Sequence, residues 1–186
     1  MNPFIGPEMS EMFSGYYGLI KNESDRGAII VAVSLFDVGL EKLIKATLVK
    51  SNPENNDPLF SGPTAPLGSF YSKTELAYRL GLLRKNTRDM LHYLRKLRNE
   101  FAHETHTVSM NDKPIEDKIK NLFLYTPDMY TILKDEVVSN GNFMEVDIDK
   151  DKIMDQIPVR HLFNLYFALN ASALNGSPHE TVRKTA

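Results

Sequence analysis

The clearest pattern along the chain is an apolar stripe at helical spacing near its centre. Four large apolar residues recur at intervals of four, three and four, so they share one face of an α-helix: Met90, Leu94, Leu97 and Phe101. The other faces are polar and hold the chain's one compact group of arginine, asparagine and histidine. We therefore predict a helix over residues 86–104 whose apolar face packs into the core.

A second helix is predicted over residues 25–50, and it is unusually apolar. Almost every position from 28 to 36 is hydrophobic, so most of the helix circumference should be buried. Ser24 is the predicted N-cap, because a serine hydroxyl accepts a hydrogen bond from a free N–H of the first turn. Asp37 and Glu41 interrupt the apolar run, and their spacing of four residues puts both carboxylates on one face.

These two carboxylates need cationic partners if the helix around them is buried. A carboxylate among apolar side chains is costly unless it is paired. Arginines of the 86–104 helix offer planar guanidinium groups that can bind a carboxylate through two hydrogen bonds. We therefore predict that the two helices pack together, that Asp37 or Glu41 pairs with Arg98, and that a structural ion-pair cluster has four members: Asp37, Glu41, Arg95 and Arg98.

The remaining segments predict an all-α, single-domain helical bundle of about six to eight helices over residues 1–186. Ser72, with Glu75 three residues later, predicts a capping box that opens a helix running to Leu83. Further helices are predicted over residues 8–20, with interruptions near Gly15 and Gly18, and from Ile115, Pro127 and Asp151, the last restarting at Pro158.

The segments between and beyond these helices are expected to be irregular. Residues 51–69 contain four prolines and two glycines and predict a long loop, which Leu59, Phe60, Leu67 and Phe70 should pin to the core. Residues 143–149 alternate weakly between apolar and polar, which favours a short extended segment. An N-terminal arm at 1–7 and a flexible C-terminal tail at 176–186 complete the expected organisation.

Composition excludes several kinds of site. The chain has no cysteine, so disulfides, thiolate nucleophiles and cysteine-based zinc sites are excluded. His103 and His106 lie three residues apart, but no third ligand has a matching spacing. No glycine loop with a lysine is present that could cradle a phosphate. We therefore expect no metal site and no cofactor.

Charge and hydropathy bear on the partners and the location. The net charge of −2 means that overall charge would not draw the protein to DNA. The first 13 residues lack the basic and apolar regions of a signal peptide, and no apolar run approaches the roughly 20 residues that cross a bilayer. We expect a cytoplasmic protein with no membrane partner.

Residues 73–94 superficially resemble a helix-turn-helix, with Gly81 at the turn. Three basic residues at the start of the second helix would then contact DNA phosphates: Arg84, Lys85 and Arg88. However, Thr87 stands where this motif usually has a packed aliphatic residue, and the second helix carries the core stripe on toward His103. Direct DNA binding is therefore the disfavoured interpretation.

The segment Arg98-Asn99-Glu100-Phe101-Ala102-His103 resembles the Arg-x4-His motif of the HEPN superfamily. This resemblance implies a small helical domain, commonly dimeric. In the nuclease members, the arginine and the histidine of two chains meet in a cleft and cleave RNA without a metal. It would make His103 the acid–base group, Arg98 the stabiliser of phosphate charge and Asn99 an orienting group.

Three consecutive blocks cover much of the chain: SDRGAIIVAVSLFDVGLEKLIKATLV at 24–49, PLFSGPTAPLGSFYSKTELAYRLGLL at 58–83 and LRKLRNEFAH at 94–103. In order and spacing, over roughly residues 8–175, they resemble the mannitol operon repressor family. This resemblance implies a helical protein linked to the control of mannitol-uptake genes. It does not imply a mechanism.

Together these observations predict a transcriptional regulator, a repressor of a mannitol-uptake operon, that acts through protein contacts and has no enzymatic activity. Its partner would be another regulatory protein or a transcription component, and a homodimer is expected through the face bearing Asn99 and His103, by analogy with HEPN domains. In this interpretation Arg98 neutralises a buried carboxylate and His103 caps the C-terminus of its helix. The alternatives are a metal-independent HEPN-type ribonuclease and direct DNA binding through residues 73–94.

Overall fold

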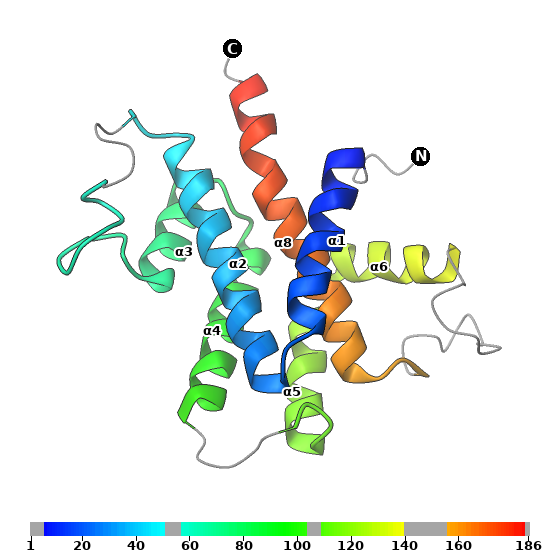
Figure 1. Ribbon diagram of the computed structural model, residues 1–186. Helices are drawn as coiled ribbons and strands as arrows, with labels where there is room; N and C mark the ends of the chain where they lie inside the picture. The colour runs from blue at the N-terminus through cyan, green and yellow to red at the C-terminus, as the bar shows by residue number, and fades with distance from the viewer. Residues whose placement is uncertain (1–5, 51–56, 104–108, 140–155, 185–186) are drawn as a thin grey trace.

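The computed structural model describes residues 6–50, 57–103, 109–139 and 156–184 (Figure 1). These residues form seven α-helices and no strand, which confirms the predicted all-α bundle of about six to eight helices. The helices are α1 (Pro7–Lys21), α2 (Asp25–Lys45), α3 (Phe70–Arg79), α4 (Lys85–His103), α5 (Lys113–Phe123), α6 (Pro127–Ser139) and α8 (Val159–Lys184). None of these described helices is both long enough and apolar enough to span a membrane.

The centre of the bundle is α8, against which α1 and α2 pack side by side (Figure 1). Its residues from 162 to 175 are almost all buried, so this helix is covered on nearly every side. Gly39 of α2 allows the close approach of the two long helices. A Cβ at that position would lie 2.8 Å from Asn175 Nδ2 and 3.1 Å from Leu174 Cδ2, so a larger residue would push α8 away.

The α2 and α4 helices confirm two sequence predictions. Ser24 caps α2, since its Oγ accepts a hydrogen bond from Gly27 N at 3.1 Å. The apolar stripe of α4 is at most 2% exposed at all four predicted positions, and α4 packs against α2, as expected. The observed bounds of α4 differ from the predicted 86–104 by one residue at each end.

The start of α3 differs from the prediction. The helix begins at Phe70, because Ser69 is the N-cap and its Oγ accepts a hydrogen bond from Ser72 N at 3.0 Å. The predicted capping box of Ser72 and Glu75 is therefore wrong. The helix ends before Gly81, whose φ of +73° lies in the left-handed region that glycine adopts without strain.

Two predicted irregularities are absent from the described helices. α1 runs without a break through Gly15 and Gly18, because its packing on α8 and α2 offsets the roughly 1 kcal/mol that each glycine costs a helix. α8 continues to Lys184, past residue 176, where the tail is predicted to begin. Extending a helix that packing has already formed costs less than starting one, which accounts for the longer α8.

The long loop is only partly described, from residue 57, and these residues form no helix. Phe60 and Phe70 are each 7% exposed and pin it to the core as predicted, whereas Leu59 is 41% exposed and does not. The extended segment predicted at 143–149 lies outside the described residues.

Candidate functional site

The Arg-x4-His residues lie together on the last turns of α4. Arg98 and Asn99 are half-buried, and His103 is exposed at the end of the helix. Their positions differ by five residues, which separates Arg98 from His103 by roughly 140° around the axis. Within the described ranges, none of the three side chains forms an ion pair or a hydrogen bond. No described side chain therefore competes with a ligand or a second chain for these three groups.

The predicted pairing of Arg98 with Asp37 or Glu41 is wrong. Lys73 of α3 fills that role, with its Nζ 2.9 Å from Asp37 Oδ2 and 3.0 Å from Glu41 Oε2. The Lys73 side chain is only 5% exposed, so the charge of this ammonium group is satisfied mainly by the two carboxylates. The physical reason is topological, because α3 also packs on α2 and brings its first turn over the acidic face.

Lys45 completes this acidic cluster. Its Nζ lies 2.7 Å from Glu41 Oε1, so Glu41 is held between two ammonium groups. Burial by itself would raise the pKa of Glu41, but the hydrogen bonds from Lys45 and Lys73 outweigh it and hold that pKa below its ordinary value. The Oδ1 atom of Asp37 is buried and has no hydrogen-bond partner among the described residues.

Arg95, the other arginine predicted for this cluster, has a different environment. Its guanidinium lies 5.3 Å from the centre of the Tyr71 ring, which is a cation–π contact. Its Nε is buried and lacks a hydrogen-bond partner within the described part of the chain. Asp37 and Glu41 therefore lie together as predicted, but Arg95 and Arg98 are not among their partners.

Sequence reasoning missed a second cluster, which joins α3 to α4. Glu75 Oε1 accepts a hydrogen bond from Arg88 Nε at 2.7 Å and lies 2.6 Å from His92 Nε2. The hydrogen bonds from Arg88 and then His92 hold the pKa of Glu75 below its ordinary value. The signal was present in the sequence, since a hairpin turning near Gly81 brings Glu75 opposite the first two turns of the next helix.

The basic residues of the helix-turn-helix interpretation all have acidic partners. Arg88 pairs with Glu75, and Lys85 Nζ lies 2.8 Å from Asp89 Oδ2. Arg84 Nη1 lies 3.5 Å from Asp128 Oδ2 of α6, although both side chains are largely exposed. The local positive potential at the start of α4 is therefore reduced by neighbouring carboxylates.

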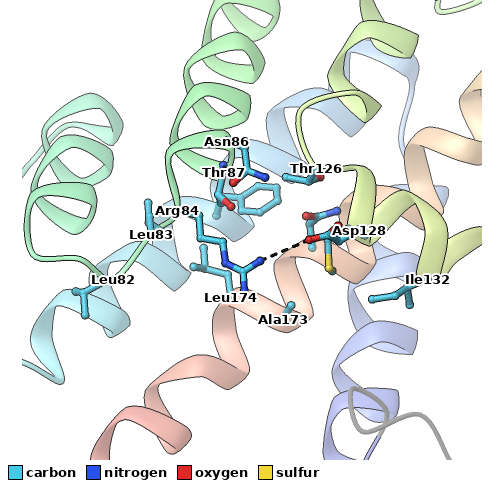
Figure 2. A pocket seen from close by; sticks show the side chains of 13 residues that line it. Leu82, Leu83, Arg84, Asn86, Thr87, Thr126, Asp128, Ile132, Ala173 and Leu174 are labelled. Carbon is cyan, nitrogen blue, oxygen red and sulfur yellow. Dashed lines mark hydrogen bonds and ion pairs between the residues drawn. The ribbon is translucent and has the colours of Figure 1, made fainter.

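A pocket of about 520 Å³ opens beside this corner (Figure 2). It lies where the α3–α4 turn and the first turns of α4 and α6 meet α2 and α8. Its lining comes from segments far apart in the chain, which is why no local sequence motif indicates it: Phe36, Leu82, Leu83, Arg84, Asn86, Thr87, Thr126, Asp128, Met129, Ile132, Asn170, Ala173 and Leu174.

The described residues contain no group of three or more histidine, cysteine, aspartate or glutamate side chains that could hold a metal ion. No protein-family model, curated protein or solved structure matches this chain. The two family resemblances therefore rest on the residues quoted for them.

Proposed function

We propose that this protein is a transcriptional regulator, a repressor of a mannitol-uptake operon, that acts through protein contacts and does not read bases itself. The operon is suggested by the similarity of residues 24–49, 58–83 and 94–103 to the mannitol operon repressor family. The partner is another regulatory protein or a transcription component.

The observation that carries the proposal is the pairing of the cations at the start of α4. A protein that holds DNA uses free lysine and arginine side chains to replace counterions at phosphates. Here Arg84, Lys85 and Arg88 each have a carboxylate within 3.5 Å. Those carboxylates reduce the net positive charge at this corner, so it offers a DNA backbone less attraction than three unpaired cations would.

An exposed apolar face on α2 supplies a surface for protein contact. Ile30 and Val38 are 42% and 51% exposed, and Ser34 between them is also exposed. Their spacing of four residues places all three on one side of the helix. Two exposed aliphatic side chains on one side of a helix, with only a small serine between them, favour docking of another apolar surface.

The experiment is a repression assay in cells with a reporter on the mannitol-uptake promoter. The double variant Ile30→Asp with Val38→Asp should abolish repression, because it places two charges in the proposed contact surface. Leu124→Asp is the matched control, since Leu124 is an exposed apolar residue at the end of α5. The double variant Arg84→Gln with Lys85→Gln should repress normally.

A DNA-shift assay with purified protein separates this proposal from direct DNA binding. We expect no sequence-dependent shift by the protein alone. A salt-sensitive shift on the operator that Arg84→Gln with Lys85→Gln removes would contradict the proposal and restore the helix-turn-helix interpretation.

A second candidate function is metal-independent RNA cleavage of the HEPN type, and one observation favours it. Arg98 and His103 have no ionic partner within the described residues, so no carboxylate competes with a phosphate for them. Because roughly 140° of helix separates them, the residues of two chains would have to meet. Incubation of RNA with the wild type and with His103→Ala tests this, and equal background decay would reject it.

A further inference from the structure

The pocket beside the α3–α4 turn has the size and lining of a small-molecule site. Its volume of about 520 Å³ lies within the roughly 300–1,000 Å³ typical of such sites. Apolar side chains from four segments form much of its wall: Phe36, Leu82, Leu83, Met129, Ile132 and Leu174. This wall suits the apolar body of a ligand.

The first turns of two long helices supply a positive end. Asn86 and Thr87 line the pocket from the start of α4, and Asp128 and Met129 line it from the start of α6. First-turn N–H groups have no backbone acceptor inside their own helix, and the helix dipole favours an anion beside them. In α4 the Thr87 N–H already donates to Asn86 Oδ1 at 2.9 Å, so there the dipole, and not this N–H, is what an anion would meet. The Thr126 hydroxyl just before α6 is hydrogen-bonded to the Tyr166 hydroxyl.

Arg84 adds a full positive charge at the mouth. Figure 2 shows its guanidinium reaching across the opening toward Asp128, with Nη1 3.5 Å from Oδ2. The two side chains are 82% and 75% exposed, so this ion pair contributes little to stability. The guanidinium can therefore exchange the Asp128 carboxylate for one on a ligand.

An independent observation comes from α8. Asn170 lines the pocket and is only 7% exposed. Its Nδ2 donates a hydrogen bond to Tyr166 O at 2.9 Å, whereas its carboxamide oxygen accepts none from the described residues. This oxygen is not among the buried polar atoms that lack a partner, so solvent reaches it and a ligand hydroxyl or N–H can donate a hydrogen bond to it.

We infer that the pocket binds a small organic carboxylate with an apolar body and a hydrogen-bond donor. The carboxylate meets Arg84 and the first turns of α4 and α6, the body rests on the apolar wall, and the donor reaches Asn170. This inference does not depend on the proposed repressor function. It gives the protein an effector site that its sequence motifs do not indicate.

The test uses 3-(4-hydroxyphenyl)propionate, which has all three features, as the probe. Titration of the ¹⁵N-labelled full chain should shift the amide resonances of Asn86, Thr87 and Met129. Arg84→Gln should raise the Kd about tenfold or more, since it removes a charge-assisted hydrogen bond. Asp128→Asn should lower the Kd about threefold, because it removes the carboxylate that competes for Arg84.

Lys85→Gln is the matched control, since Lys85 is the next residue and is 76% exposed, but it does not line the pocket. Its Kd should stay within about twofold of wild type. Binding of tyramine, the corresponding amine, as tight as that of the acid would overturn the inference. Amide shifts confined to other regions, or equal losses in the Arg84 and Lys85 variants, would also overturn it. 3-Phenylpropionate lacks the hydroxyl group. If it binds with the same Kd as 3-(4-hydroxyphenyl)propionate, Asn170 does not bind the ligand, and that part of the inference is wrong.

Discussion

Basic side chains lie at both ends of α4, but only those at the N-terminal end have carboxylate partners among the described residues. At the N-terminal end, Arg84, Lys85 and Arg88 each have a carboxylate partner, supplied by α6, by α4 itself and by α3. At the C-terminal end, Arg98 and His103 have no such partner among the described residues. Residue type therefore does not decide which cation is available for binding. What decides it is where carboxylates lie on α3, α4 and α6.

The half-buried acidic pair of α2, Asp37 and Glu41, belongs to the same comparison. Asp37 and Glu41 share the ammonium group of Lys73, which comes from α3 and not from α4. Because Lys73 neutralises these carboxylates, Arg98 has no carboxylate partner in the part of the chain that the structure describes. Variants of the paired and the unpaired cations test this comparison, and their expected effects differ in size.

Lys73→Met should give the largest effect. It removes the buried cation and leaves Asp37 and Glu41 as neighbouring carboxylates with one fewer partner. We expect a loss of about 3 kcal/mol in the free energy of unfolding, at the lower end for breaking a buried pair because both carboxylates keep some contact with water. Urea denaturation measures it. Lys118→Met, which breaks the exposed pair with Glu100, should cost less than about 1 kcal/mol.

Arg88→Ala should give an intermediate effect. It removes the hydrogen bond to Glu75 and the guanidinium that lies 4.9 Å from the centre of the Tyr78 ring. We expect a loss in the free energy of unfolding that is smaller than that of Lys73→Met, because Arg88 and Glu75 both keep contact with water. Lys113→Ala, at an exposed pair, is the comparison in the same denaturation experiment. Equal losses in the two variants would show that the Glu75 cluster does not stabilise the α3–α4 hairpin.

A lower pH should destabilise the protein through the same paired carboxylates. The pKa values of Glu41 and Glu75 are lowered in the folded protein, so the stabilisation is present above the ordinary glutamate pKa of 4.5. It is lost as the pH falls through their lowered folded-state values. Between pH 6 and pH 3, Glu75→Gln should therefore lose less stability than the wild type. Parallel pH profiles of the two proteins would contradict the assigned hydrogen bonds.

Local patterns could predict the helices, because helical spacing and capping act over a few residues. The α4 stripe and the Ser24 cap follow from spacing and side-chain chemistry alone, and the structure confirms both. Local patterns did not predict the continuity of α1 through Gly15 and Gly18, because that continuity depends on packing against α8. Tertiary contacts there outweigh the weak local preference of glycine.

The partners of charged groups could not be predicted in the same way. That Asp37 and Glu41 need a cation followed from their place in an apolar helix, but the choice of Lys73 depends on how α3 crosses α2. The pocket is lined by both Arg84 and Asn170, which lie far apart in the chain. Spacing along one helix contains no information about such contacts.

The free energy of unfolding of Arg98→Ala, measured by urea denaturation near pH 7, tests the central comparison most directly. If Arg98 is free, as its lack of a carboxylate partner indicates, the loss should be under about 1 kcal/mol. A loss of about 3–5 kcal/mol, typical of breaking a buried ion pair, would show that Arg98 is held inside the protein and would contradict the account.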